Sequence, residues 1–277
     1  MNKILYVTSF NSHLFKICGR TLIQTYLTMP QVDHPILITY EDIVLSQLQA
    51  VMNQYLHKDK VLYYDLEEDG WLEQWLDANR DIIPETMGGE GKECNCPLGD
   101  DKWRTVDHIK GCPRTYYNFR ASQWFRKVAA LAYALSLNYD IIIFVDADIE
   151  WLKPIPDSKI LEAFGDDYGV FYHLGDTRRE RDLGIESGFI GFKKDTGGFD
   201  FLRKVIATFD TGEFRKYERW DDGYIFKKIV EECPQYKTRD LVVGQTKPKK
   251  CMEYGIFNEY VRHNKGVHKF NILRKWT

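Results

Sequence analysis

DIIIFVDADIEW, residues 140–151, contains five consecutive apolar residues followed by two aspartates, Asp146 and Asp148. An apolar run without alternation is typical of a strand that is buried on both faces, as in a parallel sheet. Ligands of such sheets bind at the carboxyl ends of the strands. Both carboxylates can turn toward one divalent cation, which prefers oxygen ligands and shares them with substrate phosphates. The stretch therefore predicts a site for a metal and a diphosphate, although aspartates at such positions also cap turns and helices.

The composition indicates an ordinary globular protein. The chain has 277 residues, of which 44% are hydrophobic and 14% aromatic, so it can bury a substantial core. No linker rich in Pro, Gly or Ser and no internal repeat divides it. We therefore expect one domain over residues 1–277.

Charge, apolar segments and cysteine content argue against a nucleic-acid-binding, a membrane-spanning and a disulfide-rich secreted protein. The formal net charge is −3, from 38 basic and 41 acidic side chains, and gives no overall attraction to nucleic acid. The N-terminus has no signal-like apolar segment, and no apolar stretch reaches the length of a membrane span. Six scattered cysteines do not suggest a disulfide framework. These features together predict a soluble cytoplasmic protein.

Strand-like and helix-like patterns alternate along the first half, which predicts a parallel sheet with right-handed crossovers. The predicted strands there are 3–8, 35–40, 61–65 and 140–145, and the predicted helices are 14–27, 43–56, 70–78 and 121–137. The second half is predicted to contain strands at 168–172, 187–192 and 241–243 and helices at 199–209 and 223–232. Residues 80–117 have no periodic pattern, which is typical of a functional or mobile loop.

A second polar motif lies near the C-terminus, where residues 263–269 read HNKGVHK. The His263 imidazole can complete a metal site, Gly266 lets the backbone approach a phosphate, and Lys269 adds a positive charge. With the aspartate pair, these residues suit a nucleoside diphosphate held by a metal. The alternative is a solvated basic tail.

These motifs resemble those of the metal-dependent GT-A glycosyltransferases, in particular the glycogenin and lipopolysaccharide galactosyltransferase type. That family has Asp-x-Asp at the end of a central strand and His-x-x-Gly-x-x-Lys near the end of the domain. Two further landmarks occur here in the same order, at Glu186-Ser187-Gly188-Phe189 and Trp220-Asp221-Asp222-Gly223. Glu186 stands where the family usually has Asn, Asp222 stands where it usually has Gln, and Phe270-Asn271 replaces the Pro-Trp that often follows the lysine.

The resemblance implies an α/β fold of the GT-A type, with a Rossmann-type, mostly parallel central sheet flanked by helices. Residues 1–150 would then form the nucleotide-sugar-binding half and residues 151–277 the acceptor half. It also implies a UDP-sugar donor, a glycan, glycoprotein or other hydroxyl acceptor, and retention at the anomeric carbon. The implied Mn²⁺ or Mg²⁺ would be bound by Asp146, Asp148 and His263.

Several other side chains are candidates for binding the donor. In similar enzymes a basic residue on the helix before the Asp pair contacts the donor, which suggests Arg126 or Lys127, although either can be an ordinary solvated residue. The resemblance adds Ser187 and Gly188 to the donor site. Thr8, Phe10 and Asn11 end the first predicted strand, where Phe10 can stack on a base and the polar side chains can contact its edge; Asn is equally common in turns and caps.

Three carboxylates are candidates for the chemistry: Asp222, Asp221 and Glu186. A carboxylate beside the sugar or the acceptor hydroxyl can stabilise developing positive charge or accept a proton. Asp222 is the first choice because of its position at a predicted helix start, although the spacing in the family that the chain resembles points equally to Asp221. One of the two adjacent aspartates can instead cap that helix.

Four residues of the irregular stretch, Cys94, Cys96, His108 and Cys112, form a permitted ligand set for structural Zn²⁺. The Cys-x-Cys spacing is not that of a usual zinc knuckle, so thiols in a loop are the simpler interpretation.

Other functions remain open at the level of sequence. The alternatives are an inverting enzyme, a glycosyltransferase that acts on a nucleic-acid base, and a non-catalytic nucleotide-sugar-binding protein. A lost metal ligand would mark the non-catalytic protein, and none of the predicted ligands is lost. Aspartyl-nucleophile phosphatases also carry Asp-x-Asp, but on the first strand and followed by Thr, whereas here Glu150 occupies that place.

Overall fold

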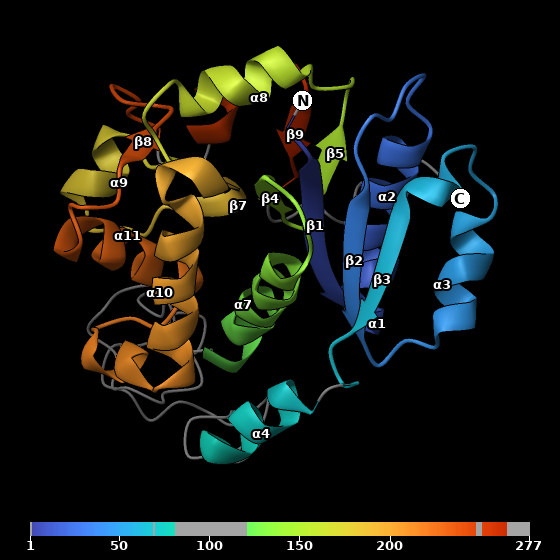
Figure 1. Ribbon diagram of the computed structural model, residues 1–277, viewed down its shortest axis with the longest axis horizontal. Coiled ribbons are helices and arrows are strands. Elements are labelled where there is room, and N and C mark those ends of the chain that lie inside the picture. The colour runs from blue at the N-terminus through green and yellow to red at the C-terminus, as the bar shows by residue number, and fades with distance from the viewer. Residues whose placement is uncertain (1, 69, 81–120, 248–250, 265–277) are drawn as a thin grey trace, which may run out of the picture.

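A seven-stranded sheet forms the centre of the computed structural model, which describes residues 2–68, 70–80, 121–247 and 251–264 (Figure 1). The strand order is β3-β2-β1-β4-β7-β6-β8. All neighbouring strands are parallel except β7, which is antiparallel to both β4 and β6. The mostly parallel sheet is thus confirmed. Its strands are β1 (Ile4–Asn11), β2 (Ile36–Glu41), β3 (Val61–Asp65), β4 (Ile141–Val145), β6 (Val170–His173), β7 (Glu186–Lys193) and β8 (Thr238–Asp240).

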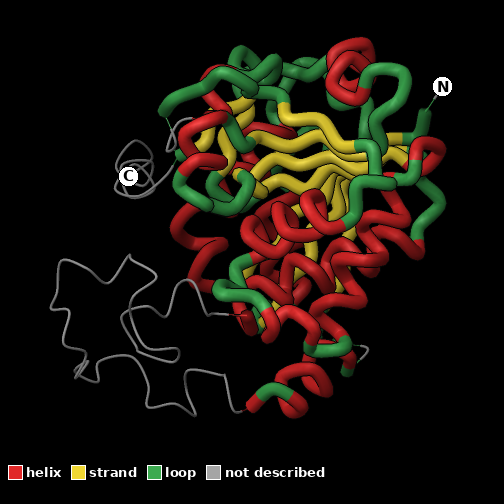
Figure 2. Tube along the Cα trace, turned by 90° about the vertical axis from the view of Figure 1, so that its left-hand side faces the viewer, coloured by secondary structure: helices red, strands yellow, loops and turns green. Residues whose placement is uncertain are grey.

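Helices cover both faces of the sheet and make a three-layer α/β/α arrangement, seen edge-on in Figure 2. One hydrophobic core lies between the sheet and helices α4 (Trp71–Ala78), α7 (Ala121–Ser136), α10 (Gly198–Asp210) and α11 (Asp222–Glu232). The other lies under α2 (Arg20–Leu27), α3 (Leu45–Met52) and α8 (Asp157–Phe164). The described part also contains two short helices, α1 (Ser12–Leu14) and α9 (Asp176–Glu180), and a two-stranded sheet of β5 (Ile149–Trp151) and β9 (Val261–His263). Short π- or 3-10-helical segments lie at Phe15–Gly19, Lys58–Lys60, Lys194–Thr196, Glu213–Lys216 and Cys251–Tyr254.

Strand β4 explains why an apolar run without alternation is needed at this position. Side chains of a strand point alternately to opposite faces of the sheet. Ile142 and Phe144 accordingly enter the core under α7, whereas Ile141, Ile143 and Val145 enter the opposite core. All five are at most 1% exposed. The strand that leads to Asp146 is therefore fixed by packing on both faces.

Most predicted elements are present with shifted ends, and two predictions need correction. The helix predicted at 14–27 is interrupted by a π-helical segment, Phe15–Gly19, between α1 and α2. The strand predicted at 241–243 is wrong, because β8 ends at Asp240 and a turn follows. The Asp240 carboxylate accepts hydrogen bonds from the backbone N–H groups of Leu174, Gly175 and Val242, and thereby turns the chain away from the sheet.

Within the described ranges, no helix is both long and apolar enough to cross a membrane. Cys18 and Cys233, the cysteines whose side chains are described, form no disulfide.

The core under α7 gives the first testable prediction. Phe125 is fully buried and stacks on Trp75 with ring centroids 4.1 Å apart. Phe125→Ala should lower the free energy of unfolding by about 3–5 kcal/mol, because it removes a large buried ring and leaves a cavity. Leu56→Ala is the control, since Leu56 is 83% exposed and its truncation should change stability little. Equal denaturation midpoints of the two variants would contradict the described core.

Candidate active site

The antiparallel orientation of β7 places Asp146 beside the motif Glu186-Ser187-Gly188-Phe189. Because β7 runs opposite to β4, the start of β7 lies beside the end of β4, and Val145 pairs with Phe189. The backbone N–H of Asp146 continues the pairing by donating to the carbonyl of Gly188 at 2.8 Å. Glu186, at the first position of β7, is thus held at the same sheet edge as Asp146.

The small two-stranded sheet delivers His263 to the same place. Strand β5 follows the aspartates directly and pairs antiparallel with β9, so that Ile149 lies opposite His263. The backbone N–H of Asn264 donates to the carbonyl of Asp148 at 3.0 Å. His263 Nε2 is then 3.0 Å from Asp148 Oδ1, and both side chains are almost fully buried.

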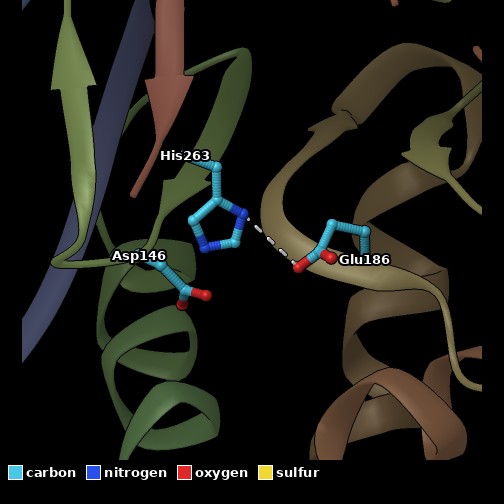
Figure 3. A group of neighbouring side chains, drawn as sticks. All are labelled: Asp146, Glu186 and His263. Atoms are coloured by element: carbon cyan, nitrogen blue, oxygen red, sulfur yellow. Dashed lines mark ion pairs between the residues drawn. The ribbon is translucent and has the colours of Figure 1, made fainter. Parts of the chain in front are cut away.

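Asp146, Glu186 and His263 each offer a ligand atom, and the three atoms lie within 4.8 Å of one another (Figure 3). His263 Nδ1 is 3.7 Å from Glu186 Oε1. The three residues predicted to bind the metal, Asp146, Asp148 and His263, are therefore neighbours, and Glu186, predicted for the chemistry, joins them. Carboxylate oxygens and an imidazole nitrogen are suitable ligands for Mn²⁺ or Mg²⁺.

Gly188 allows the cluster to be this tight. A Cβ atom at position 188 would lie 2.9 Å from Asp146 Oδ2 and 2.9 Å from His263 Cε1. Any side chain here would push the carboxylate and the imidazole apart. The carboxylate of Asp146 and the imidazole of His263 can therefore approach each other because position 188 has no side chain.

Lys127 links this cluster to the start of helix α11. Its Nζ is 2.9 Å from Asp146 Oδ1 and 2.5 Å from Asp222 Oδ2, and its side chain is 6% exposed. Burial by itself lowers the pKa of Lys127, but the two carboxylates outweigh that effect and raise the pKa above its ordinary value. Lys127 is therefore a fixed positive charge between two acids rather than a solvated helix residue.

Asp222 and Asp221 have different surroundings. Asp222 faces inward, where the Ser187 hydroxyl donates to its Oδ2 at 2.7 Å beside Lys127. Asp221 is the N-cap of α11, accepts from the backbone N–H of Tyr224 at 3.1 Å and pairs with Arg219. Burial raises the pKa of Asp221, and Arg219 acts in the opposite direction. The capping role that the sequence left open for one aspartate therefore belongs to Asp221.

Three other residues predicted to bind the donor have structural partners, and a fourth, Thr8, is buried. Arg126, the residue before Lys127 on α7, pairs with Glu41 at the end of β2. Thr8 is fully buried, and the Phe10 ring is buried against Phe15 with centroids 5.3 Å apart. Asn11 caps α1 by accepting from the backbone N–H of Leu14 at 2.9 Å. The nucleotide contacts proposed for these side chains stay predictions.

Gly266, Lys269 and the possible zinc ligands Cys94, Cys96, His108 and Cys112 lie outside the described residues. Within the described part, Arg178 and His173 are neighbours of the site that sequence reasoning did not single out. Arg178 Nη1 is 3.7 Å from Glu186 Oε2, and His173 lies opposite Glu186 in the pairing of β6 with β7. The Arg-rich run at 178–181 was the only signal in the sequence for the former.

Comparison with models of known protein families and with curated proteins returns no match. Solved structures do match. Mouse xyloside xylosyltransferase 1, in its apo form, has a TM-score of 0.52 at 14% sequence identity, covering 87% of this chain and 84% of that chain. The bifunctional glycosyltransferase WbbM, also in its apo form, has a TM-score of 0.50 at 12% identity, covering 99% of this chain and 44% of its own.

The fold is therefore that of the GT-A glycosyltransferases, as the sequence motifs predicted. At such low identities the likeness concerns the fold, and the activity must be argued from the site.

His173 gives a prediction for stability against pH. It is fully buried, its Nδ1 lies 3.2 Å from the Phe189 carbonyl, and its Nε2 has no hydrogen-bond partner. Burial lowers the pKa of His173 from 6.5 to about 4, against the opposing effects of Glu186 and Asp240. Between pH 6.5 and pH 4 the unfolded chain thus binds a proton that the folded protein does not, so stability must fall as the pH falls.

The full contribution, reached near pH 4, is about 3 kcal/mol for a difference of this size. His173→Asn keeps a donor for the Phe189 carbonyl but cannot titrate, so its stability should fall less over this pH range than that of the native protein. The measurement is urea unfolding at a series of pH values, with exposed His13→Asn as the control. Parallel pH profiles for the native protein and His173→Asn would contradict the assignment of a neutral buried imidazole.

Proposed function

We propose that this protein is a glycosyltransferase that moves a sugar from a nucleotide-sugar, specifically a UDP-sugar, to an acceptor hydroxyl with the help of Mn²⁺ or Mg²⁺. The carrying observation is the convergence of Asp146, Asp148, Glu186 and His263 at one edge of the sheet. The fold, which occurs in glycosyltransferases, supports the same conclusion.

The charge of the site favours a divalent cation. Four carboxylates, those of Asp146, Asp148, Glu186 and Asp222, face two cationic side chains, Lys127 and Arg178. The acidic side chains thus outnumber the basic ones in a partly buried region, where an excess of charge of one sign is costly. A divalent cation would offset this excess.

Asp146 and His263 belong both to the set that the motifs predict and to the group whose ligand atoms lie within 4.8 Å of one another. The third protein ligand is either Asp148, as the sequence motif predicts, or Glu186. When bound, such a cation neutralises negative charge on the departing diphosphate. Gly266 and Lys269 would assist at the phosphates, as the C-terminal motif predicts.

The remaining chemistry falls to the carboxylate of Asp222. Ser187 and Lys127 hold this carboxylate in one orientation, in which it can stabilise positive charge at the anomeric carbon. The resemblance to the glycogenin type favours retention of configuration. The acceptor is expected to be a glycan, a glycoprotein or another hydroxyl compound, and the protein is expected to act as a single domain in the cytoplasm.

Binding of the donor with a cation can be tested directly. A panel of UDP-sugars with Mn²⁺ should raise the unfolding temperature, since a ligand at one hundred times its Kd stabilises by about 2.7 kcal/mol. Asp146→Asn should abolish this cation-dependent shift. Asp140→Asn is the matched control, because Asp140 precedes the other end of β4 and its amide can still accept from the Lys3 N–H. A panel that produces no shift and no hydrolysis with Mn²⁺ or Mg²⁺ would refute the proposed function.

The role of Asp222 is tested by its amide. Asp222→Asn should lower turnover by about two to four orders of magnitude while UDP affinity barely changes, because the lost charge acts on the sugar and not on the diphosphate. Asp221→Asn is the comparison, since Asn caps helices about as well as Asp. Transfer rates of both variants should be measured with an acceptor found by screening. Near-native turnover in Asp222→Asn, or an equal loss in Asp221→Asn, would remove Asp222 from the chemistry.

A further inference from the structure

Asp182 lies in the turn between α9 and β7, in a backbone conformation that favours glycine. Its φ is 48°, and among the described residues Asp42 is the only other non-glycine residue with a positive φ. Aspartate and asparagine tolerate this conformation better than most side chains, and it persists only where surrounding contacts hold it. The contacts of Asp182 therefore indicate what fixes this turn.

Two side chains of helix α11 hold the Asp182 carboxylate. The Tyr224 hydroxyl donates to Oδ2 at 3.0 Å, and Lys227 Nζ donates to Oδ1. The Lys227 side chain is 4% exposed, and its other carboxylate partner is Glu231 on the same helix, 3.3 Å away. Burial by itself would raise the pKa of Asp182, but Lys227 and Tyr224 outweigh that effect and lower the pKa below its ordinary value. Asp182, Tyr224 and Lys227, here called the clamp, thus tie the turn to a buried lysine of α11.

Below the clamp, the turn and the start of α11 pack backbone against backbone. A Cβ atom on Gly184 would lie 2.4 Å from the backbone nitrogen of Tyr224, and one on Gly223 would lie 2.4 Å from the carbonyl oxygen of Ile185. The backbone N–H of Ile185 donates to the Gly223 carbonyl at 2.9 Å. Lys227 extends this close contact by one further turn of the helix.

The contact joins the two elements that carry the proposed chemistry. Asp222 is the first residue of α11, and Ser187, whose hydroxyl donates to Asp222 Oδ2 at 2.7 Å, is the second residue of β7. The turn leads directly from Asp182 through Ile185 into β7. A shift of α11 against the turn would therefore move the Asp222 carboxylate relative to Ser187 and to the edge of the sheet.

We propose that Asp182 is a positioning residue for sugar transfer, which clamps Tyr224 and Lys227 and thereby fixes the place of the Asp222 carboxylate. This inference rests on the proposed function, because it gives Asp182 an effect on the chemistry assigned to Asp222. The Asp182 carboxylate bonds to α11 through side chains other than Asp222, so its effect passes through the helix.

The first test compares two variants that each remove one carboxylate from Lys227. Asp182→Asn tolerates the same backbone conformation but loses the charge that joins the turn to α11. It should lower kcat for transfer by about 10- to 100-fold, as expected for a small displacement of a catalytic group, and change the KM for the donor by less than about twofold. Glu231→Gln is the matched control, since Glu231 pairs only with residues of its own helix, Lys227 and Lys228, and kcat should stay within about twofold of native. Equal kcat losses in the two variants overturn the proposal.

A double-mutant cycle with Asp222→Asn separates positioning from a general loss of structure. If Asp182 acts by placing the Asp222 carboxylate, Asp182→Asn should lower transfer by less than about twofold once residue 222 has lost its charge. An equal loss from Asp182→Asn in the native and the Asp222→Asn background overturns the proposal.

Hydrogen exchange provides a measurement that needs no activity. The backbone N–H groups of residues 224–227 should exchange at least about tenfold faster in Asp182→Asn than in the native protein, and at the native rate in Glu231→Gln. Unchanged exchange in Asp182→Asn overturns the clamp but leaves the proposed glycosyltransferase function intact. Absence of transfer by the native protein with every donor of the panel refutes the proposed function and, with it, this role of Asp182.

Discussion

The buried ammonium of Lys127, held between Asp146 and Asp222, is the interaction on which the geometry of the site depends. It joins three elements that are distant in sequence: helix α7, the end of β4 and the start of α11. Removing a charge from water costs several kcal/mol, and only close opposite charges compensate for that cost. Here two carboxylates raise the pKa of Lys127 despite its burial, so the lysine stays charged and keeps both acids in place before any ligand arrives.

A second constraint is the direction of β7. In a fully parallel sheet the start of this strand would lie at the opposite edge, far from Asp146. Because β7 is antiparallel to β4, Glu186, Ser187 and Gly188 meet the end of β4 instead. One reversed strand therefore adds a carboxylate, a hydroxyl and a side-chain-free space to the edge where the parallel strands end.

The sequence predicted the central sheet well because β4 and its neighbours are long enough to show a clear apolar pattern. It also singled out most residues of the cluster, since the Asp pair, Glu186 and His263 stand in motifs, and the roles of these residues stay predictions. It did not predict how His263 reaches Asp148, because β5 and β9 have three residues each and their pairing is not visible in periodicity. The strand predicted at 241–243 is wrong for a similar reason, because a run of three apolar residues is too short to distinguish a strand from a turn. The Asp240 carboxylate accepts from the Val242 N–H and stabilises a turn there instead.

Unsatisfied buried groups indicate a ligand only when their surroundings do. The described part of the protein has such a nitrogen on both His173 and His263. His173 Nε2 faces the backbone of Gly255, where a Cβ would lie 2.9 Å away, and burial lowers the pKa of this imidazole although Glu186 and Asp240 act in the opposite direction. His263 lies between two carboxylates, with Nε2 3.0 Å from Asp148 Oδ1 and Nδ1 3.7 Å from Glu186 Oε1. Its neighbours, and not the histidine itself, therefore set the candidate metal site apart from the position of His173.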